Sequence, residues 1–87
     1  MFKVWSDKAW DDYLYWQTQD KKTLKKINNL IKECERTPFD GTGKPEELKY
    51  LSDNYWSRRI DGKNRLVYKV KDEQLLIASC RDHYRKR

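Results

Sequence analysis

The sequence predicts an α+β fold, in which an antiparallel β-sheet carries two N-terminal helices packed on one face. Two segments within the first 36 residues place apolar side chains at helical spacing, and three later segments alternate apolar and polar side chains as half-buried strands do. A chain of 87 residues supports one hydrophobic core of modest size, so we expect a single domain over residues 1–87.

The first helix follows a short β-prone run at residues 2–5. Ser6 is suited to cap this helix, which is expected to end near Gln17. Acidic residues gather near its N-terminus, where the helix dipole favours them. The apolar positions that recur at helical spacing are Ala9, Trp10, Tyr13 and Leu14.

The second helix is expected to run from a cap at Asp20 to about Arg36, where Thr37-Pro38 ends it. One face of this segment is apolar and the opposite face carries lysines, so the apolar face should lie on the core. The apolar stripe consists of Leu24, Ile27, Leu30, Ile31 and Cys34.

Residues 39–51 are expected to form a loop, because glycine and proline supply turns and many of the other residues are charged. Strands are expected at 55–60, 65–71 and 75–81, joined by hairpin connections into an antiparallel meander. The middle strand has one face with Leu66, Tyr68 and Val70 and another with Arg65, Val67 and Lys69. One face of the sheet can therefore cover the helices while the other is basic.

The composition is basic: 20 Lys and Arg against 14 Asp and Glu give a net charge of +6. Such a charge is typical of proteins that bind nucleic acid, although many basic proteins bind none. The chain has no apolar stretch of roughly 18 residues and no apolar leader, so we expect a cytoplasmic protein without a membrane segment.

Cysteine and tryptophan are expected to be buried. Cys34 and Cys80 lie in apolar runs without a CxxC pattern, which predicts two reduced, buried thiols and no metal site. The large aromatic side chains expected in the core rather than as stacking platforms are Trp5, Trp10, Trp16 and Trp56.

The only histidine, His83, follows the last expected strand. Metal-free RNA cleavage needs a base for a 2′-hydroxyl proton, an acid for the departing 5′-oxygen and cations for the charge that grows on the phosphorus. Histidine can be that acid because its ordinary pKa, roughly 6.5, lies near neutrality. Its neighbour Tyr84 can lie flat against a base. A single histidine near a terminus is, however, more often a solvated tail residue.

Four arginines are candidates to hold a phosphate, because the planar guanidinium binds two oxygens at once: Arg58, Arg59, Arg65 and Arg81. We expect Arg59 and Arg65 to do so, with Lys49 as an additional point charge. The base can be either Glu46 or Glu47, and composition does not select between them.

The chain resembles the YoeB toxins of bacterial toxin–antitoxin systems, within the RelE superfamily, from Met1 to Tyr84. The motifs that carry the resemblance are Trp10-Asp11-Asp12-Tyr13-Leu14-Tyr15-Trp16-Gln17, Thr37-Pro38-Phe39, Gly43-Lys44-Pro45-Glu46, Trp56-Ser57-Arg58-Arg59-Ile60, Arg65-Leu66-Val67-Tyr68 and Cys80-Arg81-Asp82-His83-Tyr84. The resemblance implies a microbial-ribonuclease-like fold and cleavage of mRNA in the A site of the 70S ribosome. Because the chain has one histidine and no cluster of carboxylates at ligand spacing, we expect no metal ion or other cofactor. It also implies inhibition by a YefM-type antitoxin.

The resemblance further implies a role for each matching residue. Glu46 would be the general base, His83 the general acid and Arg65 the transition-state cation. The residues that would contact the phosphate and position the base are Lys49, Arg59 and Tyr84.

Several alternatives stay open. Unlike the family members compared, the chain continues past the His-Tyr pair with a basic extension at 85–87, which can contact phosphate, crowd Tyr84 or remain a disordered end. The chain can also be a RelE-fold toxin that binds another target, as the ParE inhibitors of gyrase do, or a non-catalytic RNA-binding module. The sequence does not decide between a monomer and a homodimer.

Overall fold

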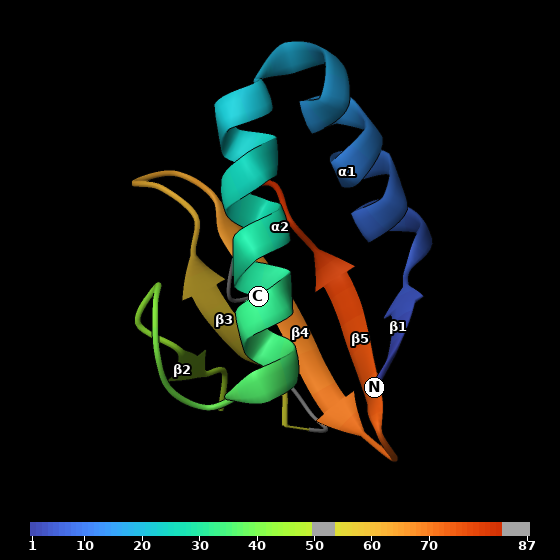
Figure 1. Cartoon of the computed structure of the whole chain (residues 1–87), viewed down its shortest axis with the longest axis vertical. Coiled ribbons are helices and arrows are strands. Elements are labelled where there is room, and N and C mark those ends of the chain that lie inside the picture. The colour runs from blue at the N-terminus through green and yellow to red at the C-terminus, as the bar shows by residue number, and fades with distance from the viewer. Residues whose placement is uncertain (50–53, 83–87) are drawn as a thin grey trace.

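The computed structural model describes residues 1–49 and 54–82, which form two helices and a five-stranded sheet. The helices are α1 (Asp7–Gln19) and α2 (Lys21–Arg36). The strands are β1 (Phe2–Trp5), β2 (Glu46–Glu47), β3 (Trp56–Arg59), β4 (Arg65–Lys71) and β5 (Gln74–Ser79). Both helices cover the same face of the sheet, with α2 over its middle strands and α1 toward β5 and β1 (Figure 1). The predicted α+β fold is confirmed.

The sheet has the strand order β1-β5-β4-β3-β2. Its centre is the predicted antiparallel meander of β3, β4 and β5. The two edges differ from the prediction, since β1 pairs in parallel with β5 and makes the sheet mixed. On the other edge β2 pairs with β3 inside the segment that was expected to be a loop only. β1 pairs with residues that are distant in the sequence, and β2 lies in a segment with the composition of a loop. Local sequence patterns encode neither pairing.

A single residue, Asp20, joins the two helices. Its N–H donates to the last turn of α1, and its carboxylate accepts the N–H groups of Lys22 and Thr23 at the start of α2. The hydroxyl and backbone N–H of Thr23 lower the pKa of Asp20 by stabilising its charged form. Ser6 caps α1 as predicted, by accepting the N–H of Ala9 at 3.0 Å.

The core lies between the helices and the sheet. Burying each Leu or Ile side chain there contributes roughly 1.5–3 kcal/mol. Both cysteines are free and buried, as predicted, and burial raises the pKa of the Cys34 thiol to about 11 and that of Cys80 to about 12. The core residues of α2, β4 and β5 are Ile27, Leu30, Ile31, Cys34, Leu66, Tyr68, Leu75 and Ile77.

The buried stripe of α1 is rotated relative to the predicted one. The buried residues of α1 are Ala9, Asp12 and Trp16, whereas Trp10 is 46% exposed and stacks on Tyr13 at the surface. The prediction that Trp10 lies in the core is therefore wrong. It holds for Trp16, which is 8% exposed, while the expected core tryptophans that are only partly buried are Trp5 and Trp56. The rotation follows from the role of Asp12, which is turned inward to bind the backbone of Cys80.

Candidate active site

A pocket of about 350 Å³ opens where β2, β3 and the start of β4 meet. Its lining includes three of the residues predicted for the site, Glu46, Arg59 and Arg65. The other lining residues are Gly43, Lys44, Pro45 and Ser57. Ser57 was named only as part of the motif at residues 56–60 and was given no role in the site, because its side chain carries no charge.

The strand register explains why these side chains share a pocket. Glu46 on β2 pairs with Ser57 on β3, and two residues further along β3 Arg59 pairs with Arg65 on β4. Residues two apart on a strand face the same side of a sheet, so one carboxylate and two guanidinium groups lie together. The same alternation separates the two glutamates that composition could not separate, because Glu46 lines the pocket and Glu47 does not.

The pairing of Arg59 with Arg65 places like charges directly opposite each other, an arrangement that costs free energy in a sheet. It also makes the pocket attractive to anions, since two planar guanidinium groups can bind several oxygens of one phosphate. Among the residues that line the pocket, the positive charge comes from Lys44, Arg59 and Arg65.

Arg65 is held in place by the turn that precedes β4. Its Nη1 donates to the backbone oxygen of Asp61 at 2.9 Å and to that of Asn64 at 3.2 Å. Both bonds use one nitrogen of the guanidinium group, and a guanidinium carries five N–H donors. The turn therefore orients Arg65 while leaving donors that a ligand can use.

The wall of the pocket opposite β4 is the backbone of Gly43. Its carbonyl accepts the N–H of Arg59 at 2.7 Å, and its φ of +86° lies in the left-handed region. A Cβ at this position would lie 3.0 Å from the carbonyl oxygen of Arg59. Gly43 is thus needed both for its conformation and for the close approach of the loop to β3.

Arg58, one of the four candidate arginines, does not line the pocket. Its side chain faces the helices, the side opposite Arg59, and is completely buried. The alternation of residues along β3 is the physical reason, since neighbours on a strand point to opposite faces.

The buried guanidinium of Arg58 instead ties the loop before β2 to the core. Its ion pair with Glu33 at the end of α2 has a nitrogen–oxygen distance of 3.1 Å. Hydrogen bonds chiefly from Thr42, with a further one from Arg58, lower the pKa of Glu33. The loop carbonyls that accept hydrogen bonds from the same guanidinium are those of Thr37, Asp40 and Thr42. This network connects α2 to the loop that leads into Gly43 and Glu46.

Arg81, another of the four candidate arginines, makes a different contact. Its guanidinium stacks on the ring of Tyr15 in α1, 3.6 Å from the ring centroid, and it does not line the pocket. A cation held over an aromatic ring in this way is stabilised by the ring itself. We therefore assign Arg81 to the contact between the end of the sheet and α1.

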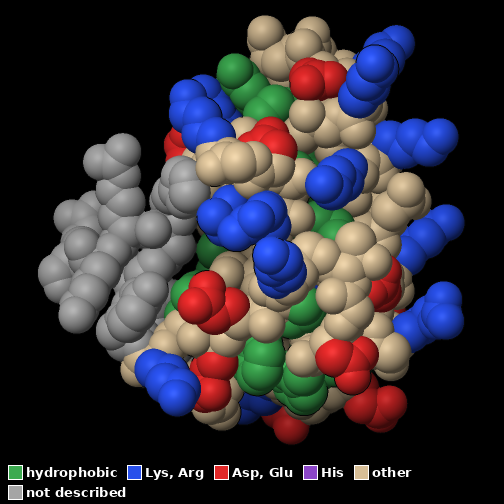
Figure 2. All heavy atoms as spheres, turned by 90° about the vertical axis from the view of Figure 1, so that its left-hand side faces the viewer, with side chains coloured by type: hydrophobic (Ala, Val, Ile, Leu, Met, Phe, Trp, Pro, Cys, Tyr) green, Lys and Arg blue, Asp and Glu red, His purple; other side chains and the backbone are tan. Residues whose placement is uncertain are grey.

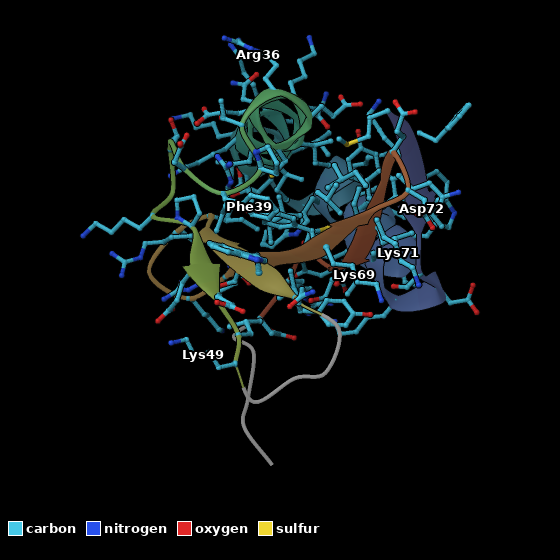
Figure 3. All side chains as sticks on the ribbon, turned by 90° about the horizontal axis from the view of Figure 1, so that it is seen from below. Arg36, Phe39, Lys49, Lys69, Lys71 and Asp72 are labelled. Carbon is cyan, nitrogen blue, oxygen red and sulfur yellow. The ribbon has the colours of Figure 1, made fainter. Side chains whose placement is uncertain are left out.

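Three of the predicted site residues lie outside the pocket or outside the described ranges. Lys49 is exposed and lies on the side of the sheet opposite α2 (Figure 3). It does not line the pocket. His83 and Tyr84, as well as the extension at 85–87, lie outside the described residues.

The face that carries β2 is not uniformly basic. Figure 2 shows basic and acidic side chains mixed over this side of the molecule. On the sheet face that was expected to be basic, Ser57 and Val67 are buried beside Arg59 and Arg65. Lys49 and Lys69 lie on the same side of the sheet outside the pocket (Figure 3), so the positive charge of this face is interrupted by uncharged side chains but is not confined to the pocket.

Residues 1–49 and 54–82 contain no group of three His, Cys, Asp or Glu side chains placed to hold a metal ion. Within the same ranges, neither helix has the length and apolar character needed to cross a membrane.

Comparison with known proteins places the chain in one family. Residues 5–84 match the model of the YoeB-like toxin of bacterial type II toxin-antitoxin systems. The toxin YoeB of Escherichia coli strain K12 is 60% identical over 81 residues, which cover 93% of this chain and 96% of that protein. A YoeB/ParE toxin from Agrobacterium tumefaciens superposes with a TM-score of 0.90 at 46% identity, covering 97% of this chain and 100% of that one. The YoeB toxin of Staphylococcus aureus in a heterotetrameric complex with YefM superposes with a TM-score of 0.84 at 45% identity, covering 97% and 98%.

Proposed function

The chain belongs to the YoeB-like toxins of bacterial type II toxin–antitoxin systems, and from this membership and the pocket we propose that it is a ribosome-dependent endoribonuclease. It cleaves mRNA in the ribosomal A site, in the cytoplasm, and thereby inhibits translation. The observation that carries the proposal is the pocket that Glu46, Arg59 and Arg65 line together.

The proposed reaction begins with attack by the 2′-hydroxyl of the RNA on the adjacent phosphorus. Glu46 takes the hydroxyl proton as the bond from O2′ to phosphorus forms. As the bond from phosphorus to O5′ breaks, His83 gives its proton to O5′. The products are a 2′,3′-cyclic phosphate and a free 5′-hydroxyl. Positioned acid and base groups contribute about 10² to 10⁴ each to such a rate.

Cations stabilise the charge that grows on the phosphorane. Arg65 is held by the turn and pairs with Arg59 across the two strands, and both line the pocket, so both can donate to non-bridging oxygens of one phosphate. A placed charged donor of this kind contributes about 10² to 10³. In this mechanism the arginines supply the positive charge and no metal ion takes part. Lys49 contacts the phosphate backbone from outside the pocket, and Tyr84 positions the base.

The substrate's own 2′-hydroxyl is the most economical nucleophile. It is tethered beside the phosphorus, and well-oriented intramolecular groups reach effective concentrations of about 10⁵–10⁸ M. Water would have to be captured and oriented by further groups.

The proposed inhibitor is a YefM-type antitoxin. The Staphylococcus aureus relative was solved in complex with YefM, and a pocket with two opposed arginines suits an acidic segment that folds as it binds. A YoeB dimer from the same organism superposes on this chain with a TM-score of 0.88 at 46% identity, and we propose that the free toxin also forms a homodimer.

The experiment that tests the function is a primer-extension map of cleavage on translated and untranslated message. Cleavage is expected only in the A site of translating ribosomes. A 2′-deoxy substitution on the nucleotide 5′ of the cut should abolish it, while the same substitution one nucleotide further 3′ should be tolerated. Cutting of the deoxy substrate at a comparable rate would mean attack by water and would overturn the mechanism. Inhibition of gyrase without RNA cleavage would overturn the function itself.

A further inference from the structure

We propose that Asn64 is a positioning residue that acts through the backbone of Asp82 on the proton-donating step. The inference rests on the proposed function, because it concerns the residue that follows Asp82 in the chain, the proposed acid His83. Asn64 lies in the turn between β3 and β4 and is only 7% exposed, which is unusual for a turn asparagine.

The side-chain amide of Asn64 joins two separate segments. Its Nδ2 donates to both carboxylate oxygens of Asp61, at 3.2 and 3.1 Å. Its Oδ1 accepts the backbone N–H of Asp82 at 2.7 Å. Asp82 is 18 residues further along the chain, so one side chain connects the hairpin turn to the segment after β5.

Asp61 determines which way the amide points. An ionised carboxylate only accepts hydrogen bonds, so the NH₂ group of Asn64 must face Asp61 and the oxygen must face Asp82. Burial opposes ionisation of Asp61, but hydrogen bonds from Asn64 and the backbone N–H of Lys63 outweigh it and lower its pKa. The carboxylate stays ionised at neutral pH, and the orientation of Asn64 is fixed.

The backbone of Asp82 is bound at both of its polar groups. While its N–H donates to Asn64, its carbonyl accepts the backbone N–H of Arg65 at 3.1 Å. Its φ of 69° lies in the left-handed region, a conformation that needs such support in a residue other than glycine. Asp82 is thereby attached to the first residue of β4, whose side chain lines the pocket.

The two residues before Asp82 are held by α1, independently of Asn64. The carboxylate of Asp12 accepts the N–H of Cys80 at 3.0 Å, and the indole N–H of Trp16 donates to the carbonyl of Cys80 at 2.8 Å. Arg81 stacks on Tyr15. Loss of the Asn64 side chain should therefore free residue 82 without detaching the segment, which makes the effect local.

The test is the Asn64→Ala variant in single-turnover cleavage on ribosomes. A misplacement of about 1 Å can cost up to about 10²-fold in rate, so we expect kcat to fall by about 10- to 100-fold with KM within about twofold of the wild-type value. The matched control is Asn29→Ala, an exposed asparagine on α2, which should leave cleavage unchanged. Asp61→Asn, which removes the fixed acceptor, should give a smaller loss in the same direction.

A double-mutant cycle separates positioning from general loosening of the fold. If Asn64 acts through the acid, Asn64→Ala should cost almost nothing in a His83→Gln background and its full factor in a Glu46→Gln background. An equal loss in both backgrounds, or no loss in the wild type, would overturn the inference.

Hydrogen exchange distinguishes failure of this inference from failure of the proposed function. The amide of Asp82 should be protected in the wild type and lose protection in Asn64→Ala, whether or not the protein cuts RNA. If His83→Gln leaves cleavage unchanged, the proposed mechanism fails. If Asn64→Ala leaves the exchange rate of the Asp82 amide unchanged, the positioning role fails, whatever the result for His83→Gln.

Discussion

The hydroxyl group of Tyr68 and the guanidinium of Arg58 meet inside the core, with 3.2 Å between the hydroxyl oxygen and Nε. The same hydroxyl donates to the carbonyl of Pro38 at 2.6 Å. Two strands of the sheet and the loop after α2 are thereby joined at one buried point. Burial raises the pKa of Tyr68 to about 12, so the hydroxyl keeps its proton and its role as donor at neutral pH.

Replacing Arg58 with methionine should destabilise the fold strongly. The change leaves Glu33 without its cation and three loop carbonyls without a donor, and each buried polar group left without a hydrogen-bond partner costs about 1–3 kcal/mol. Urea unfolding measures the change. The control is Arg36→Met at the exposed end of α2 (Figure 3), which should change the free energy of unfolding by less than about 0.5 kcal/mol. Equal effects of the two variants would contradict the structural role of Arg58.

The free energy of unfolding should fall in acid. The folded-state pKa values of Glu33 and Asp61 lie below the ordinary values of 4.5 and 3.8, so the unfolded chain binds protons more readily. The stability these groups contribute is fully present above about pH 5 and is lost as the pH falls through their folded-state pKa values. Urea unfolding at a series of pH values should show a flatter acid dependence for Glu33→Gln. A curve that stays parallel to the wild type would contradict the assignment, and Glu73→Gln, in an exposed turn, is the control.

Two adjacent glutamates allow a matched test of the general base. Glu46→Gln should lower single-turnover cleavage by at least about 10²-fold, because glutamine is nearly the same size but cannot take a proton. Glu47→Gln removes an equal charge one residue away, outside the pocket, and should change the rate by less than about threefold. Ribosome binding by both variants should match the wild type. A larger loss for Glu47 would mean that the strand register assigns the base wrongly.

Arg65→Glu should weaken the antitoxin complex as well as catalysis. Replacing a pocket cation with an anion opposes an acidic segment, and disrupting a buried charge pair at an interface costs about 2–5 kcal/mol. Titration calorimetry should therefore show affinity reduced by at least about 10-fold, with the difference shrinking in high salt. The control is Lys21→Glu, which makes the same charge change at an exposed residue of α2 outside the pocket. An antitoxin that is insensitive to Arg65 would have to inhibit the toxin at another surface.

Local patterns predicted the parts of the structure that local physics determines. The caps at Ser6 and Asp20, the apolar stripe of α2 and the central meander follow from side-chain types at fixed spacing, and all are confirmed. The parallel pairing of β1 with β5 joins segments about 72 residues apart, and nothing in Phe2–Trp5 specifies its direction. The predicted buried face of α1 was displaced by one position from the observed one. The apolar pattern did not reveal that the carboxylate of Asp12 is buried to bind the backbone of Cys80.

The candidate site was predicted only in part, because strand pairing and long-range contacts determine which side chains meet there. Arg59 and Arg65 were favoured among the four candidate arginines, and alternation along β3 places Arg59 in the pocket and Arg58 on the helix side of the sheet. The family resemblance pointed to Glu46, whereas reasoning from the residues alone could separate Glu46 from Glu47 only once the pairing of β2 with β3 was known. Asn64 had no signal beyond an ordinary turn sequence, since its importance comes from a contact with residue 82 that the sequence does not reveal.

The repulsion between the opposed residues Arg59 and Arg65 makes the stability of the folded protein depend on what binds in the pocket. Any polyanion that binds there relieves the repulsion between the two guanidinium groups, so it binds the folded chain in preference to the unfolded one. A ligand at 100 times its dissociation constant adds about 2.7 kcal/mol to the free energy of unfolding. An antitoxin that covers this pair would thus stabilise the folded toxin while it inhibits the toxin. Its removal would leave the free toxin less stable against unfolding than the complex.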